Sequence, residues 1–415
     1  MPLPLIRPFT ALRPTPEYAA EVAARPYDVV TADEARAGAE GRTWSFLHVS
    51  RAEVDLPDGA DVYGPEVYAK AGENISRMLD AGVLIREPRP CYYAYRMTMG
   101  DHVQTGIAAA GSVAAYESNR IRRHELTRPD KELDRTRQIE AVGAHTGPVM
   151  VTHRPDDRVA AIIEAATEGT PGFSATTDDG TLHQIWVISG PAAVAGLTEA
   201  FEAMNAIYIA DGHHRSAAAC RVAEARRAAD PEPQGDELYE SFLIVTFPAD
   251  EVLILDYNRG VRDLNGLERG AFLTGIRAAF EVEPVDQQAR PERRGTFGMY
   301  LDGRWYRLTP REPLPKRSTA VERLDISVLT QRLLEPILGI GDPRTDPRID
   351  FIGGGRGLGA LEDRVNKGQY AVAFALFPTS LDDLMSVADA NEIMPPKSTW
   401  FEPKLADGLL SLPLE

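Results

Sequence analysis

Short apolar runs alternate with longer stretches of helical periodicity along most of the chain. In the segment 65–81, apolar residues recur on one side, and Gly82 follows as a helix stop. Runs such as ESFLIVTF and QYAVAFALF are apolar nearly throughout, which is typical of buried strands. Strands that alternate with helices predict an α/β or mixed α+β fold.

The same reasoning predicts the other elements. Helical spacing is seen in the segments 129–143, 158–168, 191–205, 325–338 and 381–390. The segments CYYAYRMTM, GPVMVTH, LHQIWVIS and AIYIA are predicted strands. The first stretch is broken by Pro and Gly, and its segments RPYDVV and SFLHVS predict short strands in loops. The segment GSVAAYE is predicted to continue a strand.

Composition and charge exclude several classes of protein. The 415 residues are 43% hydrophobic and 26% charged, which is ordinary for a folded chain. The formal net charge of −17 opposes binding to nucleic acid or to an anionic membrane. The two cysteines, Cys91 and Cys220, are far apart, which argues against a disulfide framework. With no secretory signal and no long apolar run, we expect a cytoplasmic protein.

Candidate chemistry is concentrated in the segment YIADGHHRSAAA. Asp211, Gly212, His213, His214 and Arg215 follow a predicted strand and open an Ala-rich helix. Gly212 permits a tight turn, and the helix N-terminus together with Arg215 suits an anion such as phosphate. Asp211 adds a carboxylate that can bind Mg²⁺ or accept a proton. The structural alternative is an Asp cap, a turn glycine and two surface histidines.

A second charged segment, HELTRPDKELDR, precedes a predicted helix. It contains His124, Glu125, Thr127, Arg128 and Lys131. A glutamate in such a cationic surround can serve as a general base or a magnesium ligand, and the cations can reach phosphate. The alternative is a solvated helix with ion pairs between successive turns.

These segments together resemble a known family. RPYDVV, SFLHV, HELTRPDKELDR, ADGHHR and MPPKSTWFEPKL, which follow in this order along nearly the whole chain, are similar to the bacterial and archaeal family called domain of unknown function 1015. Its central region resembles the ParB/sulfiredoxin fold, which includes free-serine kinases. One departure is the segment 256–259, Asp-Tyr-Asn-Arg, where the family pattern leads us to expect Pro-Thr-His-Arg.

The resemblance implies a division of the chain and a function. We expect an N-terminal α/β region over 1–106, a ParB/sulfiredoxin-like phosphate-binding core over 107–230, and a C-terminal α/β region over 231–415. The implied activity is a nucleotide-dependent kinase that phosphorylates a small hydroxyl compound, with free L-serine as the acceptor. ATP or ADP would be the donor, and Mg²⁺ the cofactor.

The resemblance also implies roles for individual residues. Glu125 and Asp211 match catalytic carboxylates and are the candidate Mg²⁺ ligands. The predicted phosphate- or nucleotide-binding residues are Gly212, His213, His214, Arg215, His124, Thr127, Arg128 and Lys131. The tail residues Lys397, Ser398, Thr399 and Trp400 are considered as a segment closing over phosphate, or as a tail docked by its aromatic side chains.

Other interpretations of the sequence remain open. A ParB-like nucleotide switch shares the fold but is opposed by the net charge, and a non-catalytic ligand-binding protein would need no turnover. Sulfiredoxin chemistry requires a cysteine where His213 stands. The segment around Gly355 fits a dinucleotide fingerprint loosely, and His124, His213 and His214 form a possible zinc set.

Overall fold

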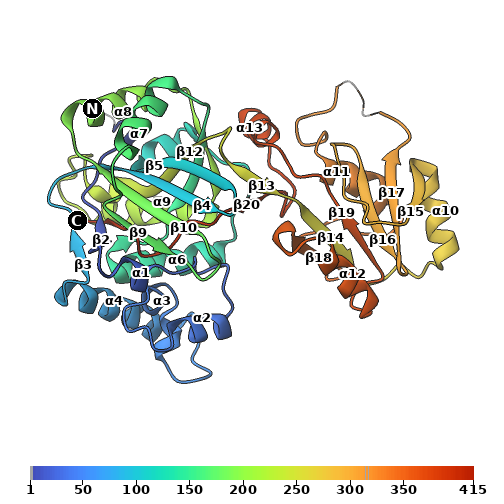
Figure 1. Cartoon of the computed structure of the whole chain (residues 1–415), viewed down its shortest axis with the longest axis horizontal. Coiled ribbons are helices and arrows are strands. Elements are labelled where there is room, and N and C mark those ends of the chain that lie inside the picture. Colours follow the sequence, from blue (N-terminus) through green and yellow to red (C-terminus); the bar gives the residue numbers. More distant parts are fainter. Residues whose placement is uncertain (1–2, 314, 316) are drawn as a thin grey trace. The chain divides into compact units, whose positions relative to one another are not determined.

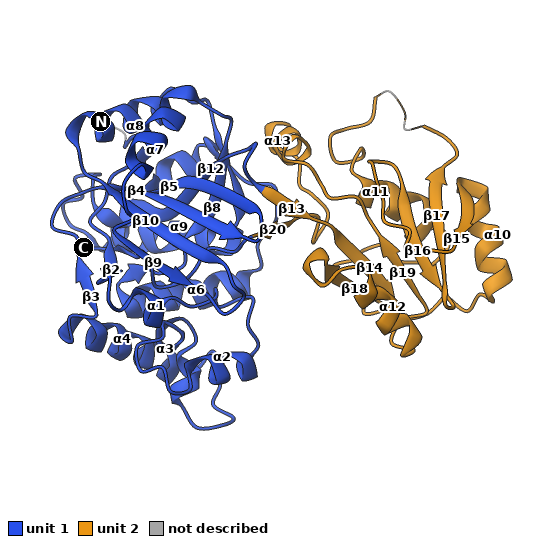
Figure 2. Ribbon diagram, in the orientation of Figure 1, with its two compact units in different colours: residues 1–252, 403–415 blue, residues 253–402 orange. Residues whose placement is uncertain are grey.

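The computed structural model describes residues 3–313, 315 and 317–415. The chain forms two compact units, unit 1 with residues 1–252 and 403–415 and unit 2 with residues 253–402 (Figures 1 and 2). Each unit combines helices with a sheet, which confirms the mixed α/β prediction. The limits predicted near 106 and 230 both fall inside unit 1, so the three-region division stays a prediction.

Unit 1 is built on a mixed nine-stranded sheet. Its strands run in the order β6 (Ile121–Arg122), β11 (Ile207–Asp211), β8 (Val149–His153), β12 (Ser241–Pro248), β5 (His102–Ser112), β4 (Tyr92–Met99), β10 (Leu182–Ile188) and β9 (Phe173–Thr176), with β1 (Ile6–Arg7) beside β5. The β11–β6 and β12–β8 pairs are parallel, and the other pairs are antiparallel. Two small ladders pair β2 (Leu12–Pro14) with β3 (Leu84–Arg86) and β7 (Ala144–His145) with β21 (Leu412–Pro413).

Helices of very different length surround this sheet (Figure 1). They are α1 (Ala19–Val22), α2 (Ala32–Ala39), α3 (Leu47–Ser50), α4 (Pro65–Asp80), α5 (Val113–Glu117), α6 (Pro129–Val142), α7 (Asp157–Thr167), α8 (Pro191–Glu202) and α9 (His213–Ala229). The predicted helices over 65–81, 129–143, 158–168 and 191–205 are therefore confirmed to within a few residues at each end.

Small residues let the central elements approach closely. The side chains of Ala108, Ala109 and Ala110 on β5 are fully buried, and a Cβ at Gly106 would come within 2.4 Å of the Thr246 carbonyl on β12. Helix α9 buries Ala218, Ala219, Val222 and Ala223 in the core that also contains Ala109. Short side chains on α9 let the helix pack close to the sheet.

Three segments predicted to be strands have a different structure. SFLHVS contains helix α3, and RPYDVV is a turn in which the Val29 N–H donates to the Pro26 carbonyl (3.1 Å). GSVAAYE leaves β5 at Ser112, whose hydroxyl accepts from the Ala115 N–H and caps helix α5. Apolar runs of this length do not distinguish a strand from one helical turn. In GSVAAYE, the cap at Ser112 starts the helix.

Unit 2 has its own six-stranded sheet and smaller core. The strand order is β15 (Phe280–Val285), β17 (Arg304–Pro310), β16 (Phe297–Leu301), β19 (Val372–Ala375), β14 (Tyr257–Val261) and β18 (Ile349–Gly353). A separate ladder joins β13 (Leu253–Leu255) to β20 (Trp400–Glu402). Its helices are α10 (Arg269–Ala279), α11 (Asp325–Leu329), α12 (Gly359–Asn366) and α13 (Leu381–Asp389).

Arg259 of β14 ties a distant loop to this sheet. Its guanidinium is almost fully buried and donates to the carbonyls of Tyr257 (2.7 Å), Pro396 (3.2 Å) and Lys397 (2.8 Å). Because a buried guanidinium needs acceptors, these backbone contacts fix the loop that contains Lys397. The role of Lys397, Ser398 and Thr399 at a phosphate stays a prediction.

No helix within the described ranges is long and apolar enough to cross a membrane.

The buried histidines of unit 1 make its stability depend on pH. Burial lowers the pKa of His124, His145, His153 and His183 from 6.5 to about 4. Between pH 6.5 and about 4, the unfolded chain therefore binds more protons than the folded chain. Each of these histidines removes about 3 kcal/mol of stability when the pH falls through this range. Asp407, whose pKa burial raises to about 7, acts in the opposite direction but is a single group.

We therefore expect unit 1 to lose stability steeply between pH 6.5 and 4. Denaturant unfolding followed at half-unit pH steps measures this slope. Replacing His153, which pairs through Nδ1 with the Thr246 hydroxyl at 2.8 Å, by Gln should reduce the slope by about one proton. Stability that stays constant or rises over this range would contradict the assignment of neutral, buried histidines.

Candidate active site

The segment ADGHHR forms a strand–turn–helix in unit 1. Strand β11 carries a bulge against β8 between Ile209 and Asp211, at the point where the strand ends. Gly212 follows with φ +106°, and α9 begins at His213. A bulge re-aims the last strand residue, and the positive φ turns the chain directly into the helix. The turn therefore presents Asp211 beside the N-terminus of α9.

Asp211 and Arg215 form an ion pair across the turn. Arg215 Nη2 lies 3.4 Å from Asp211 Oδ2, and Lys404 Nζ lies 3.5 Å from the same oxygen. Burial opposes ionisation of Asp211, but Lys404 and Arg215 outweigh it and hold the pKa of this carboxyl well below its usual value. Asp211 is therefore a carboxylate throughout the physiological range, in contact with two cations.

Arg215 is nearly buried and fixed from several sides. Its Nη1 donates to the Pro148 carbonyl, and its Nη2 lies 3.9 Å from the Asp28 carboxylate. Burial lowers the pKa of Arg215, but Asp28 and Asp211 more than compensate, and the net pKa is raised. Its Nε makes no hydrogen bond to any described residue. The turn thus holds a permanent, pre-oriented guanidinium with a spare donor.

The two histidines of the turn bind the second charged segment. The backbone N–H of His124 donates to His213 Nε2 (3.4 Å), and that of Arg128 donates to His214 Nε2 (3.1 Å). The rings of His124 and His213 meet edge to face at 4.5 Å. Burial first, and the neighbouring His124 second, hold the pKa of His213 well below its usual value. His213 is therefore neutral, and its proton is on Nδ1 because Nε2 is the acceptor.

This arrangement brings Glu125 to the turn. Glu125 Oε2 lies 3.8 Å from His213 Nδ1, and about a third of the glutamate side chain is exposed. We expected Glu125 and the ADGHHR turn to share a site, and they lie side by side in the structure. Of the predicted phosphate ligands nearby, Arg128 pairs with Asp130 (2.8 Å) and Lys131 donates to the Tyr63 hydroxyl (2.6 Å). Thr127 donates to Glu132.

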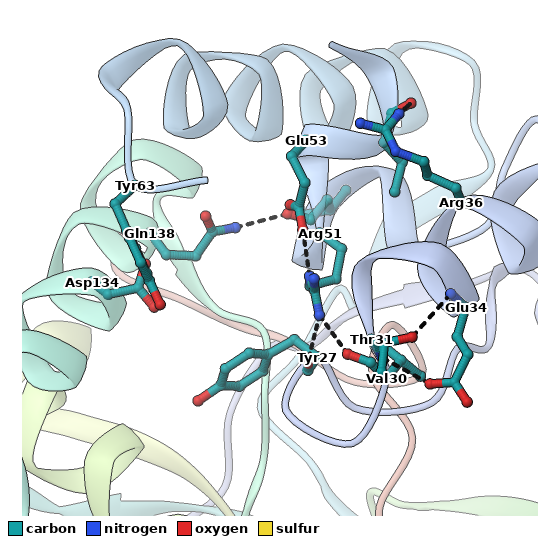
Figure 3. Close-up of polar contacts among 12 residues, drawn as sticks. Tyr27, Val30, Thr31, Glu34, Arg36, Arg51, Glu53, Tyr63, Asp134 and Gln138 are labelled. Carbon is teal, nitrogen blue, oxygen red and sulfur yellow. Dashed lines mark hydrogen bonds and ion pairs between the residues drawn. The ribbon is translucent and has the colours of Figure 1, made fainter. Parts of the chain in front are cut away.

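The loop with Tyr27 and Asp28 forms another wall. Arg51 Nη1 donates to the carbonyls of Tyr27 (2.9 Å) and Val30 (2.7 Å), while its Nε contacts Glu53 at 2.6 Å (Figure 3). The Arg135 guanidinium stacks 3.9 Å from the centre of the Tyr27 ring. These contacts hold the loop so that Asp28 faces Arg215.

A small cavity lies behind Arg215. Its volume is about 30 Å³, and its walls include Arg135, His145, Arg215 and Asp407. Asp407 Oδ2 accepts from the Tyr27 N–H (3.2 Å), whereas its Oδ1 has no partner among the described residues. Burial raises the pKa of Asp407 to about 7, although Arg215 opposes the shift. Asp407 is therefore a buried acid that titrates near neutral pH.

Sequence reasoning missed two of these side chains, Lys404 and Asp407, as parts of the site. For Asp28, the sequence left two interpretations open, a residue that lines the cleft and part of a turn. The one local signal was the presence of two charged residues in the otherwise apolar tail PKLADGLLSLPL. Their location depends on where the tail packs, which the local pattern does not reveal.

The carboxylates of this site are candidate metal ligands. Within the described part of the chain, no group of three or more His, Cys, Asp or Glu is placed to hold a metal ion. The zinc set of His124, His213 and His214 gains no support, because two of these rings accept backbone N–H groups. Asp211 offers an ionised carboxylate, the type of ligand that a hard cation prefers, and Arg215 and Lys404 approach it at Oδ2.

The fold and this turn define a mixed α/β protein with an ion-paired strand–turn–helix in unit 1. The family model described as "Protein of unknown function (DUF1015)" matches residues 6–327, and the chain belongs to this family. The resemblance inferred from the motifs is thereby confirmed. A search of curated proteins finds no match.

Several solved structures are similar to this chain at low identity. A conserved hypothetical protein from Pyrococcus furiosus is 11% identical, with a TM-score of 0.35 over 74% of this chain and 94% of that one. A free serine kinase in complex with AMP is 12% identical, with a TM-score of 0.36 over 73% and 92%. SbnI with a C-terminal truncation, from Staphylococcus aureus, is 10% identical, with a TM-score of 0.39 over 74% and 87%.

Two glycines with positive φ provide a test of the turn. A Cβ at Gly212 would lie 3.1 Å from Arg215 Nε and 3.3 Å from the Val149 Cα, whereas a Cβ at Gly180 (φ +83°) would meet nothing within 4 Å. Gly180→Ala should therefore cost only the backbone strain, about 1 kcal/mol, at the lower end of the range for such positions. Gly212→Ala should cost more, because Arg215 or β8 must also shift.

Urea unfolding of both variants measures the difference. Equal losses of stability would show that the close approach of Gly212 to Arg215 is not a constraint on this turn.

Proposed function

We propose that the chain is a nucleotide-dependent kinase that phosphorylates a small hydroxyl-bearing metabolite, with free L-serine as the expected acceptor. The observation that carries this proposal is the 3.8 Å approach of Glu125 Oε2 to His213 Nδ1. It joins a partly exposed carboxylate to a turn that already holds Arg215 and an ionised Asp211. A base and a cationic anchor thus share one site.

Two features of the turn support phosphate binding. The first turn of α9 offers its N–H groups, and Gly212 at the N-cap contributes no side chain that would cover them. Arg215 is held within a few ångströms of Asp211 and Asp28, so its charge is oriented before any ligand arrives. Pre-oriented donors cost no reorganisation when negative charge develops in a transition state.

The proposed reaction is an in-line displacement at phosphorus. The acceptor hydroxyl oxygen attacks the terminal phosphorus of the nucleotide, and the bond from that phosphorus to the bridging oxygen breaks. The shortened nucleotide leaves with the electron pair, and the hydroxyl proton passes to Glu125. Arg215 offsets charge on the phosphoryl oxygens. His213, neutral and with Nδ1–H toward Glu125, orients the base and does not compete for the proton.

Asp211, with Glu125 as a second candidate, would hold Mg²⁺ that enters with the nucleotide phosphates. The metal would neutralise charge on the phosphates, a contribution common to enzymes that transfer phosphoryl groups. The choice of L-serine as acceptor, and of ATP or ADP as donor, rests on the resemblance of the ADGHHR and HELTRPDKELDR segments to free-serine kinases.

The test is a transfer assay with ATP or ADP, Mg²⁺ and a panel of amino acids and hydroxy acids. The wild-type chain should consume donor only when an acceptor is present, and phosphorylated acceptor should appear in equal amount. Glu125→Gln removes the base and should lower the rate about 10²–10⁴-fold. Asp211→Asn should lower it comparably, because both cations lose their carboxylate partner.

Glu73→Gln provides the matched control. Glu73 lies on the exposed side of α4, where it pairs with Lys70 at 2.8 Å, and its loss should leave the transfer rate unchanged. Donor hydrolysis that needs no acceptor would instead indicate a nucleotide switch. No donor loss with any acceptor would indicate a non-catalytic ligand-binding protein. Either outcome would refute the kinase proposal.

A further inference from the structure

The cavity behind Arg215 is surrounded by buried polar atoms that have no hydrogen-bond partner among the described residues. Four such atoms belong to residues of its wall: Ser50 Oγ, His145 Nε2, Arg215 Nε and Asp407 Oδ1. These four residues are each at most 8% exposed. Buried polar atoms are rarely left unpaired, because each one costs free energy, so four of them around one space indicate a polar occupant.

The size of the cavity limits what this occupant is. A volume of about 30 Å³ accommodates about one or two water molecules, but no nucleotide or amino acid. Gly147 belongs to the same wall, and a Cβ there would lie 3.2 Å from Arg215 Cδ and 3.6 Å from Asp407 Oδ1. A side chain at residue 147 would therefore take up space beside both of these residues.

The hydrogen-bonding character of the four atoms matches that of water. Arg215 Nε is a donor, and the Ser50 hydroxyl can donate as well. Burial lowers the pKa of His145 to about 4, so the ring is neutral; its contact with the Ser241 backbone favours a proton on Nδ1, which leaves Nε2 as an acceptor. Asp407 Oδ1 is an acceptor when the carboxyl is ionised. A water molecule accepts two hydrogen bonds and donates two, which is the complement of this set.

Ions match the same four atoms less well than water does. An anion would face the lone pair of His145 Nε2 and the carboxylate of Asp407. A cation would face the guanidinium groups of Arg215 and Arg135, which both line the cavity. Because each kind of ion meets like charge or a lone pair of the wrong sign at short range, the occupant is neutral.

Water also accommodates both ionisation states of Asp407. Burial raises the pKa of this carboxyl to about 7; Arg215 and Arg135 oppose the shift, and Asp28 adds to it. Oδ2 accepts from the Tyr27 N–H (3.2 Å), so a proton on the carboxyl resides on Oδ1. The protonated group then donates to water, and the serine hydroxyl in the wall turns round to accept from water. The number of donors and acceptors stays balanced.

We propose that the cavity is a hydration site, in which ordered water bridges Arg215 Nε and Asp407 Oδ1 and completes the hydrogen bonds of the other two wall atoms. All three nitrogens of the guanidinium then have partners, because the other two already contact the Pro148 carbonyl and Asp211. The water thus connects the C-terminal segment to helix α9. This inference is independent of the proposed kinase function.

Two glycine variants of the full chain test the site in solution. Neither Gly147 nor Gly169 has a positive φ, and a Cβ at the exposed Gly169 would meet nothing within 4 Å. Gly147→Ala should displace the water and leave the four wall atoms unpaired, so its urea midpoint should fall well below that of Gly169→Ala. Magnetic relaxation dispersion of the solvent, which counts long-lived bound waters, should show fewer of them in Gly147→Ala than in wild type, and no change in Gly169→Ala. Retention of every long-lived water in Gly147→Ala would contradict the proposal.

A high-resolution crystal structure of the wild-type chain provides a second measurement, which does not depend on whether a variant folds. Density for water should lie within hydrogen-bond distance of Arg215 Nε and Asp407 Oδ1. A cavity without density would overturn the proposal. Crystals grown in bromide test the alternative of an anion, because an anomalous peak in the cavity would identify a halide site and overturn the hydration site as well.

Discussion

The carboxylate of Asp211 lies between two cations that come from different parts of unit 1. Arg215 is one helical turn away, and Lys404 is 193 residues further along the chain. Burial opposes ionisation of this carboxyl, but the two cations, each within 3.5 Å, hold its pKa well below the usual value. Strand β11, helix α9 and the C-terminal segment thus meet at one carboxylate. Gly212, with φ +106°, makes the geometry possible.

The histidines of the turn act differently from what their residue type suggests. By residue type alone, adjacent histidines in a phosphate-binding motif would be assigned as cationic ligands of the phosphate. Here the Nε2 atoms of His213 and His214 accept backbone N–H groups from the segment that carries Glu125. Burial keeps His213 neutral, so it contributes orientation and not charge. Positive charge at the turn comes instead from Arg215 and Lys404, which both pair with Asp211.

Local sequence signals were sufficient for the parts of the site that are local. The strand, glycine turn and Ala-rich helix at 207–229 follow from periodicity and from the preference of glycine for positive φ. The helix over 129–142 follows from Pro129 and the residue spacing. Short segments such as SFLHVS were assigned wrongly, because four to six apolar residues fit a strand and a helical turn equally well.

The nonlocal parts of the site could not be predicted from the sequence, and the reason is physical. Unit 1 is discontinuous, and its last segment arrives after all of unit 2. The backbone pairing of Asp407 with Ala24, and the approach of Lys404 to Asp211, depend on where buried leucines of the tail find space in the core. The pattern of apolar residues along the chain indicates that such residues are buried, but it does not indicate which residues they pack against. The approach of Asp28 to Arg215 likewise depends on Arg51 and on the packing of the loop.

The acidic composition of the chain is compatible with the proposed anion site in unit 1, because the net charge and the site act over different distances. A net charge of −17 acts through solvent, where ions screen it within about 10 Å. The cations of the site are nearly buried: the side chains of Arg215 and Lys404 are 9% and 15% exposed. Their contacts act in a medium of lower dielectric constant, where the same charge is worth several times more than in water. Acidic partners close to Arg215, including Asp28 and Asp407, moderate that field and keep the guanidinium oriented when no ligand is bound. Anion binding at this turn, as proposed, would therefore depend on burial and geometry, which the overall charge does not reveal.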